Sequence, residues 1–249
     1  MTLLIIGCGS IGSRHARNAR SLGHDVVVCD PNSERAQTLA REVGAAAYVA
    51  DYREALTHGS QIDAAVIATP SAYHVEEALY FAEQGIPICM EKPLATSTEG
   101  LAGLIKLVES KKLITMMGQS YRFHEGVLET KKILESGIMG LPQVATSYWG
   151  SYLPDWHSTE DYRREYAAQK KLGGGAMFTL MSHTLDLFVW LFGDFVEYSG
   201  TRERLSDLEI DVDDTAIITG VSKRSVRIEA KNDFITKTPQ HTLTIVGTD

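Results

Sequence analysis

One short segment constrains the fold of this chain more than any other. Residues 7–12 read GCGSIG, directly after a short apolar run and directly before a helical pattern. In this G-x-G-x-x-G arrangement the first glycine permits a tight turn, the second lets backbone approach a pyrophosphate, and the third allows close helix–strand packing. Phosphates would lie at the helix N-terminus, where free N–H groups and the helix dipole favour anions. The residues predicted to contact such a cofactor are Gly7, Gly9, Ser10, Ile11 and Gly12.

An acidic residue stands where the next apolar run ends. Asp30 comes eighteen residues after Gly12, which is the place of the carboxylate that binds the ribose hydroxyls of a dinucleotide. Because this carboxylate would repel a 2′-phosphate, the sequence predicts NAD as the cofactor. Arg35 could bind such a phosphate, so NADP stays an alternative. A glycine turn that only packs a helix against a strand, with no ligand, is the structural alternative.

Apolar runs and helical patterns alternate through the first half of the chain. Fully apolar strands separated by helices indicate a parallel sheet that is covered on both faces. Right-handed crossovers then give a doubly wound Rossmann fold. The predicted strands are 2–7, 25–30, 63–69, 86–90 and 113–118, and the predicted helices are 11–22, 33–42, 72–84 and 98–110.

The pattern changes after about residue 120, and we predict two domains, 1–119 and 120–249. The second domain opens with a helix over 125–136, followed by an alternating segment, 143–152, typical of a half-buried antiparallel strand. Further strands are predicted over 197–205, 213–221, 225–230 and 241–247. The last of these ends close to the end of the sequence, so we expect an open sheet edge and further residues in the native protein.

A long polar loop and an apolar helix lie between these strands. Residues 153–171 show no clear periodicity, whereas 172–193 open with three glycines and continue as an apolar helix carrying His183 and Asp186. Residues four apart share one face of an α-helix, so Thr179 and His183 should point the same way, with Asp186 near that face. The structural alternatives are a core histidine bonded to a backbone carbonyl, and an aspartate bonded to backbone or to an arginine.

Composition indicates a soluble globular protein and excludes several classes of function. The 249 residues are 44% hydrophobic and 22% charged, and the net charge of −8 argues against a nucleic-acid surface. We find no signal peptide and no apolar run long enough to span a bilayer, so no membrane partner is expected. Cys8, Cys29 and Cys89 lack disulfide or zinc spacing and are interpreted as small buried residues of a cytoplasmic protein. The histidines are dispersed, so no metal site is predicted.

A lysine follows the predicted strand 86–90, in the sequence Glu91-Lys92-Pro93. In doubly wound folds, ligands bind outside the carboxyl ends of the strands, so Lys92 is expected to face the cofactor. Glu91 could hold its ammonium group in place. The alternative is an ordinary surface salt bridge in a loop.

The end of the predicted strand 63–69 lies at the same rim of the sheet. Thr69 and Pro70 stop this strand, and His74 follows on the first turn of the next helix. Thr69 and Pro70 are predicted to contact the cofactor. For His74, a place lining the cofactor and a plain helix-start role both stay open.

Together these motifs resemble the glucose–fructose oxidoreductase, inositol dehydrogenase and MocA family. The resemblance rests on GCGSIG, on ATPSAYH over 68–74, on the Glu-Lys-Pro sequence and on the glycine-opened helix with its histidine. It implies a Rossmann domain followed by an α+β domain with an open, mostly antiparallel sheet. That sheet often forms the oligomer interface, so a homodimer or homotetramer is expected. Members of the family typically move a hydride between a nicotinamide cofactor and a carbon bearing a sugar or cyclitol hydroxyl.

The family pattern on the helix, G-G-x-x-x-D-x-x-x-H, matches at 174–175 and at His183 but places Thr179 where the aspartate belongs. The family lysine matches Lys92. In a typical member these groups surround the reacting carbinol. We therefore expect His183 or Lys92 to move the proton while Thr179 only orients the substrate. A catalytically silent, NAD-binding or regulatory member of the family stays the alternative, because Thr179 does not ionise usefully.

Two aromatic and basic segments indicate the class of substrate. Tyr121 and Arg122 follow the strand 113–118, and Trp156 and Arg163 stand in the polar loop. Aromatic faces stack on sugar rings and arginine forks bind carboxylates or phosphates, so these four residues are predicted to bind substrate. The loop resembles those of family members associated with bacterial surface-sugar pathways, which suggests a sugar or nucleotide sugar. The alternative is an ordinary loop with anchoring aromatic residues.

Overall fold

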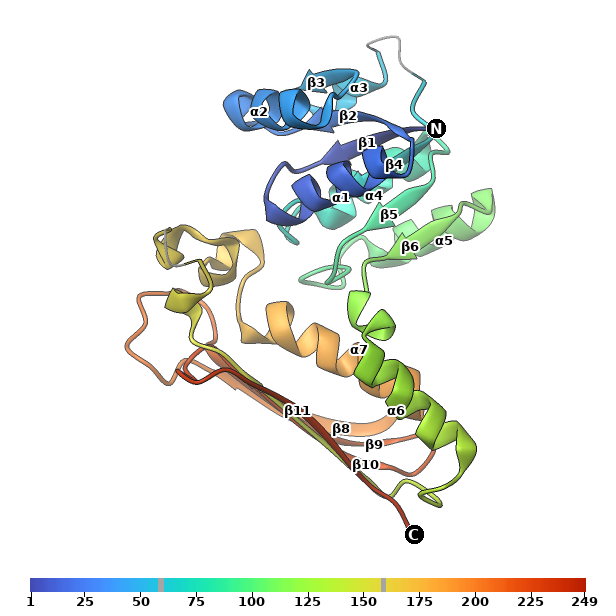
Figure 1. Cartoon of the computed structure of the whole chain (residues 1–249), viewed down its shortest axis with the longest axis vertical. Helices are drawn as coiled ribbons and strands as arrows, with labels where there is room; N and C mark the ends of the chain where they lie inside the picture. The colour runs from blue at the N-terminus through green and yellow to red at the C-terminus, as the bar shows by residue number, and fades with distance from the viewer. Residues whose placement is uncertain (58–60, 158–159) are drawn as a thin grey trace. The chain divides into compact units, whose positions relative to one another are not determined.

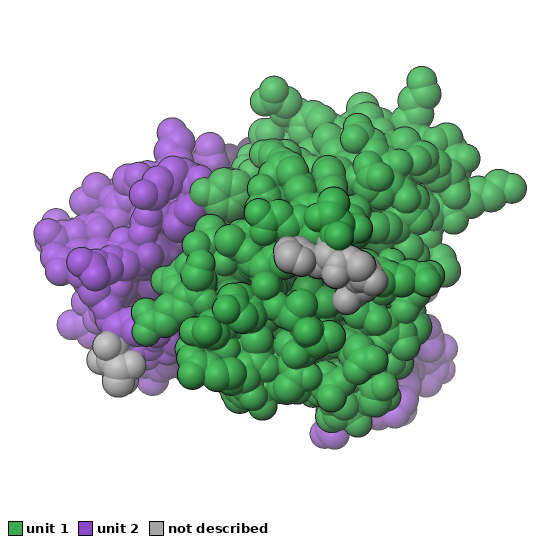
Figure 2. Space-filling view, turned by 90° about the horizontal axis from the view of Figure 1, so that it is seen from above, with its two compact units in different colours: residues 1–118 green, residues 119–249 purple. Residues whose placement is uncertain are grey.

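The computed structural model describes residues 1–57, 61–157 and 160–249. By its internal packing the chain divides into two compact units, residues 1–118 and residues 119–249 (Figure 2). Each unit has its own hydrophobic core and is described by itself.

The first unit is built on a parallel sheet with the strand order β3-β2-β1-β4-β5-β6. This is the doubly wound order, in which the direction of winding reverses between β1 and β4 and creates a crevice at their carboxyl ends. The predicted Rossmann fold is therefore confirmed. β3 was not predicted; its segment, AAAYVA over 45–50, consists largely of alanine, which is depleted in strands. The strands are β1 (Thr2–Ile6), β2 (Asp25–Cys29), β3 (Ala47–Val49), β4 (Ala64–Ile67), β5 (Ile88–Met90) and β6 (Thr115–Met117).

Helices cover both faces of this sheet, as the continuous apolar strands predict (Figure 1). Ile5 of β1 packs in a cluster with Ala16 and Leu39, and Leu4 packs in a second cluster with Phe81. The two clusters lie on opposite faces because successive side chains of a strand alternate. The helices are α1 (Ser10–Ser21), α2 (Ser33–Val43), α3 (Tyr52–Ala55), α4 (His74–Glu83) and α5 (Leu101–Lys111).

The second unit holds a five-stranded sheet with the order β11-β7-β10-β9-β8. Figure 1 shows α6 and α7 along one face of this sheet. The sheet is mostly antiparallel, as the resemblance implies. The exception is β7, which pairs antiparallel with β11 but parallel with β10, so the antiparallel pairing predicted for 143–152 holds on one side only. The elements are α6 (Glu125–Ser136), β7 (Val144–Gly150), α7 (Ser182–Phe192), β8 (Phe195–Glu203), β9 (Thr215–Ser222), β10 (Arg227–Asp233) and β11 (Gln240–Val246).

The glycine-opened segment is not the continuous α-helix that the sequence predicts. A π-helix, η6 (Met177–Met181), precedes α7, and the polar loop before it contains several short 3-10 turns. Residues 158–159 of that loop lie outside the described residues. By length and composition the stretch Lys170–Phe192 could cross a membrane, which the sequence analysis did not recognise. Its most apolar window is 61% buried in the structure, so in this unit it is a core helix.

The three cysteines differ in burial. Cys8 and Cys29 are buried at the carboxyl ends of β1 and β2, as predicted. Cys89 on β5 is only half-buried, which corrects the expectation for that residue. β5 lies next to the short strand β6 near the edge of the sheet, where less of the chain covers it.

Candidate active site

Two glycines of the turn after β1 are required by packing, and the third leaves space. Gly7 has a φ of +90°, and a Cβ there would lie 2.6 Å from the carbonyl oxygen of Ala68. A Cβ on Gly12 would lie 1.7 Å from the oxygen of Gly7, so α1 packs directly on the turn. Around Gly9, no atom of the described residues lies within 4 Å of an added Cβ. The backbone at Gly9 is therefore open to a ligand, as the dinucleotide motif requires.

The first turn of α1 presents its amide groups at this open place. Gly9 is the N-cap residue of α1, and within the described ranges no side chain caps it. Ser10 and Ile11, which follow it, are exposed. Uncapped N–H groups at a helix start attract an anion, and their direction is reinforced by the helix dipole. The turn thus fits a pyrophosphate.

Asp30, directly after β2, binds the backbone of the glycine turn through its side chain. Its carboxylate is buried and accepts hydrogen bonds from the backbone amides of Cys8 (2.9 Å) and Asn32 (2.8 Å). The guanidinium of Arg35 lies 3.7 Å away and is exposed. Each carboxylate oxygen keeps a lone pair that a ribose hydroxyl can use, so the residues fit the predicted NAD. The same contact places Arg35 where the NADP alternative needs it.

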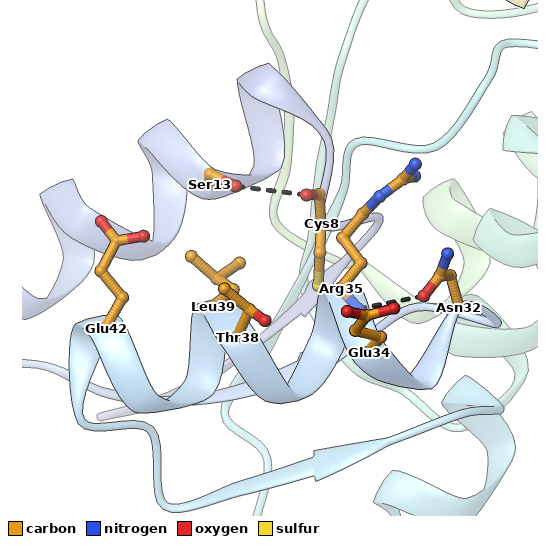
Figure 3. A pocket seen from close by; sticks show the side chains of 8 residues that line it. All are labelled: Cys8, Ser13, Asn32, Glu34, Arg35, Thr38, Leu39 and Glu42. Carbon is orange, nitrogen blue, oxygen red and sulfur yellow. Dashed lines mark hydrogen bonds between the residues drawn. The ribbon is translucent and has the colours of Figure 1, made fainter.

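A pocket of about 320 Å³ lies beside this pair, between α1 and α2 (Figure 3). The hydroxyl of Ser13 donates to the carbonyl of Cys8 at one wall, and the side chain of Asn32 caps α2 at another. The carboxylates of Glu34 and Glu42 line the pocket together with Arg35, so the charge of the pocket does not favour the 2′-phosphate of NADP. The lining residues are Cys8, Ser13, Asn32, Glu34, Arg35, Thr38, Leu39 and Glu42.

His74 connects the two turns at the rim of the sheet. Its side chain is buried, with Nδ1 2.8 Å from the carbonyl oxygen of Pro93 and Nε2 2.9 Å from that of Thr69. The Thr69 hydroxyl donates to Glu77 Oε2 at 2.6 Å, and the Lys92–Pro93 peptide bond is cis. His74 is therefore more than a helix-start residue, and α4 holds both the backbone and the side chain of Thr69.

Lys92 has the electrostatic setting of a proton-transfer group. Burial lowers the pKa of its ammonium group to about 8, and the nearby Glu91 carboxylate opposes this shift. Glu91 itself is held by His15 of α1, whose Nε2 lies 2.8 Å from Glu91 Oε1. A Cβ at Gly118 would lie 2.7 Å from the same oxygen, so a larger residue there would displace the Glu91 carboxylate. The role of His15 was not predicted, because it depends on contact between α1 and the turn after β5.

Thr179 is buried in the π-helix of the second unit. Its hydroxyl donates to the carbonyl of Gly175 at 2.7 Å, so towards any further group it can only accept a hydrogen bond. Asp213 caps this segment, because its Oδ2 accepts from the amide of Met177 at 2.8 Å. Thr179 thus belongs to a π-helix and not to the α-helix that the sequence predicts, and its shared direction with His183, four residues further on, stays a prediction.

His183 is buried on α7 within a group of aromatic rings. Its ring centroid lies 4.8 Å from that of Tyr121 and 5.6 Å from that of Trp149. Trp149 also stacks on His241 at 4.1 Å, and the two residues are register partners across β7 and β11. Trp149 and His241 were not among the predicted site residues. Both lie in predicted strands, but the pattern of one strand does not reveal its partner.

The structure gives the remaining predicted substrate residues partners within the second unit. Arg122 donates two hydrogen bonds to Asp186, at 2.8 and 2.6 Å, so Asp186 takes the arginine-bound role that the sequence allowed. The indole of Trp156 donates to Ser151 and packs on a core phenylalanine. Arg163 pairs at the surface with Asp161 and Glu209. Roles of Arg122, Trp156 and Arg163 towards a substrate stay predictions.

Comparison with known proteins assigns both units to one family. A family model described as an oxidoreductase family with an NAD-binding Rossmann fold, GFO/IDH/MocA, matches residues 1–119. A model of the GFO/IDH/MocA C-terminal domain matches residues 127–249.

Among the described residues, no group of three or more histidine, cysteine, aspartate or glutamate side chains could hold a metal ion.

Individual relatives share about a third of the residues or fewer. Levoglucosan dehydrogenase of Pseudarthrobacter phenanthrenivorans is 30% identical over 77% of this chain and 51% of its own. The scyllo-inositol 2-dehydrogenase (NAD(+)) of Bacillus subtilis is 30% identical over 76% of this chain and 53% of its own. The WlbA dehydrogenase from Bordetella pertussis, solved with NADH and UDP-GlcNAcA, has a TM-score of 0.87 at 24% identity, covering 100% of this chain and 71% of that one. The chain thus spans about half the length of these two curated relatives.

Proposed function

The chain belongs to the GFO/IDH/MocA oxidoreductase family, and from this premise we propose that it transfers a hydride between a nicotinamide cofactor and a carbinol carbon of a sugar-like substrate. The proposal is supported above all by three features that lie at one rim of the parallel sheet. An open dinucleotide turn, the Asp30 carboxylate and a lysine with a lowered pKa stand at the carboxyl ends of β1, β2 and β5 of the same parallel sheet. That edge is where doubly wound folds bind ligands.

The residues that would hold NAD follow from the geometry of the first unit. The open backbone at Gly9 and the first amides of α1, at Ser10 and Ile11, would bind the pyrophosphate. Asp30 would accept hydrogen bonds from the ribose hydroxyls, and Thr69 with Pro70 would line the rim. When bound, NAD supplies the hydride acceptor. We propose NAD over NADP because the buried Asp30 carboxylate repels a 2′-phosphate.

The proton of the reacting hydroxyl needs an acceptor with a pKa near the working pH. Lys92 meets this condition, since burial lowers its pKa to about 8. His183 is the second candidate, because the ordinary pKa of histidine lies near neutrality. The Thr179 hydroxyl donates its only hydrogen to the carbonyl oxygen of Gly175, so we propose that it orients the substrate as a hydrogen-bond acceptor alone.

We propose a sugar or cyclitol as the substrate, with a nucleotide sugar as the larger form. Relatives are named for levoglucosan and inositol, and one neighbour was solved with UDP-GlcNAcA. Tyr121 and Trp149 offer aromatic faces beside His183, which suit the apolar face of a sugar ring.

We also propose a cytoplasmic homo-oligomer that associates through the second sheet. Free, buried cysteines such as Cys8 suit a reducing compartment. The strands β8 and β9 expose apolar side chains, with Val196 63% and Tyr198 75% accessible and Ile217 41% accessible. Tyr198 pairs with Gly220, three residues from Ile217, so Tyr198 and Ile217 lie on opposite faces of the sheet and do not form one patch. The proposed association through this sheet therefore rests mainly on the family resemblance.

The test begins with native mass spectrometry of freshly purified protein, which should show a retained dinucleotide. Turnover is then followed at the absorbance of the reduced nicotinamide, with levoglucosan, myo-inositol, scyllo-inositol and UDP-linked sugars. Reduction of NAD with at least one of them supports the proposal. Bound NAD without turnover of any of them favours the catalytically silent alternative.

Two comparisons test the finer assignments. Tighter binding of NADP than NAD by the unmodified protein would overturn the cofactor assignment, and loss of the preference for NAD in Asp30→Ala would support it. A pH–rate profile that stays unchanged in both Lys92→Ala and His183→Ala would overturn the assignment of the proton-transfer group.

A further inference from the structure

His74 makes an unusual pair of contacts for a buried histidine. Its two ring nitrogens lie 2.8 Å from the carbonyl oxygen of Pro93 and 2.9 Å from that of Thr69. These oxygens belong to different turns, one after β5 and one after β4, that meet at the rim of the sheet. The side chain is only 1% exposed, so water has little access to replace either partner.

Both partners can only accept hydrogen bonds, and this limits what the imidazole can do. A carbonyl oxygen has no hydrogen to donate, whereas a neutral imidazole carries a single N–H group. The neutral ring can therefore bond to one of the two turns and must turn a lone pair towards the other. The protonated ring carries two N–H groups and can bond to both at once.

The charges around His74 act in both directions. Burial lowers the pKa of the imidazole, while the hydrogen bonds to Thr69 and Pro93 and the carboxylate of Glu91 oppose that shift. The ammonium group of Lys92, next to Pro93 in the chain, lowers it further. Glu77 lies one helical turn further along α4 and holds the Thr69 hydroxyl. Burial is the larger influence, so the pKa of the imidazole lies below its ordinary value.

We propose that His74 is a positioning residue that ties the turn carrying Lys92 to the turn after β4, and that it bonds to both turns only when it carries a proton. With the proton, Nδ1 holds Pro93 and Nε2 holds Thr69. Without it, one of the two turns is released. The importance of the tie for catalysis rests on the proposed function, because it places Lys92. The proton-dependent tie itself does not.

Nuclear magnetic resonance on the whole chain tests the tie without any substrate. The ring nitrogens of His74 are observed in protein carrying ¹⁵N-histidine, and the carbonyl carbons of Thr69 and Pro93 in protein carrying ¹³C. As pH falls, both ring nitrogens should become protonated, and both carbonyl signals should shift with the same midpoint as the ring. Carbonyl signals that stay constant through the titration of the ring would overturn the proposal.

Two variants separate the tie from the fold. In His74→Gln a neutral amide replaces the ring at every pH, so the shared titration of the two carbonyls should disappear while circular dichroism stays unchanged. His24→Gln removes a histidine between α1 and β2, far along the chain from either turn, and should keep the titration. Persistence of the carbonyl titration in His74→Gln would show that another group causes it and would overturn the proposal.

Kinetics connect the tie to Lys92. With a substrate found for the unmodified protein, kcat is compared on both sides of the titration of the His74 ring. Where the ring is protonated, His74→Gln should lower kcat about tenfold or more through misplacement of Lys92, with KM for the substrate changed less than about threefold. Where the ring is neutral, the variant and the unmodified protein should differ less. An unchanged kcat at the lower pH would overturn the positioning role. If the unmodified protein turns over no substrate, the proposed function fails, and the resonance experiment still decides the tie.

Discussion

Glu77 provides a quantitative test of how burial controls charge in this fold. Its side chain is 6% exposed, and burial raises its pKa from 4.5 to about 7, with the Thr69 hydrogen bond opposing the shift. In the unfolded chain the carboxyl group keeps its ordinary pKa. Between these two values the folded chain holds a proton that the unfolded chain has lost. Stability therefore falls as pH rises from about 4.5 to about 7.

The substitution Glu77→Gln removes this penalty and keeps the hydrogen bond, since the amide oxygen can accept from Thr69. A tenfold difference in proton affinity corresponds to about 1.4 kcal/mol, so a pKa raised from 4.5 to about 7 corresponds to about 3 kcal/mol. We expect the variant to match the unmodified protein near pH 4 and to exceed its free energy of unfolding by up to about 3 kcal/mol above pH 7.

Urea unfolding at several pH values, followed by circular dichroism, measures this difference. All three tryptophans, Trp149, Trp156 and Trp190, lie in residues 119–249, so fluorescence reports the second unit separately. Glu76→Gln is the matched control, because its carboxylate is 70% exposed and pairs with Arg53 at the surface. That control should change stability by less than about 1 kcal/mol, with no gain above pH 7. A Glu77→Gln variant that is no more stable than the unmodified protein above pH 7 would refute the reasoning.

Three further outcomes follow from the contacts. Gly12→Ala should destabilise the first unit by about 3 kcal/mol or more in thermal unfolding, because the new Cβ would lie 1.7 Å from a backbone oxygen. Gly9→Ala has space for a Cβ, so it should unfold like the unmodified protein but bind NAD at least about tenfold more weakly in a fluorescence titration. Lys92→Met should lower kcat by about 10²–10⁴-fold. The oxidation rate of the unmodified protein should rise through about pH 8, and this rise should be absent in the variant. If the variant shows the same rise, a group other than Lys92 causes it. Asp186→Ala should cost about 1–3 kcal/mol in urea unfolding, because it leaves the half-exposed Arg122 guanidinium without its bidentate partner, and an unchanged midpoint would contradict this.

Much of the first unit could be predicted because its signals are local. The glycine turn, the apolar runs and the helical patterns each involve residues that are neighbours in the sequence. The packing contacts of Gly7 and Gly12 agree with the roles that the motif assigns to them. The carboxyl ends of parallel strands meet at one edge, so the placement of Asp30, Thr69 and Lys92 at the rim followed from the strand pattern alone.

The details of the site depended on pairings between distant residues. His74 meets Pro93 across α4 and β5, 19 residues along the chain, and Trp149 meets His241 through the register of β7 and β11. Arg122 and Asp186, which the sequence interpreted separately, form one ion pair. The π-helix that holds Thr179 before α7 was not predicted, because the apolar pattern of the sequence does not distinguish it from an α-helix.

Helix α4 shows most clearly which features the sequence predicts and which depend on the folded structure. The amino-acid pattern was enough to predict that a helix follows β4 and that the glycine turn and Lys92 stand at one edge of the sheet, because periodicity and strand direction are properties of neighbouring residues. The pattern did not distinguish Glu76 from Glu77, two adjacent residues of identical chemistry. In the folded chain, Glu76 faces solvent beside Arg53 and Glu77 is buried against Thr69. A side chain's pKa depends on its surroundings in the folded chain, and those are supplied by strands and helices far away in the sequence.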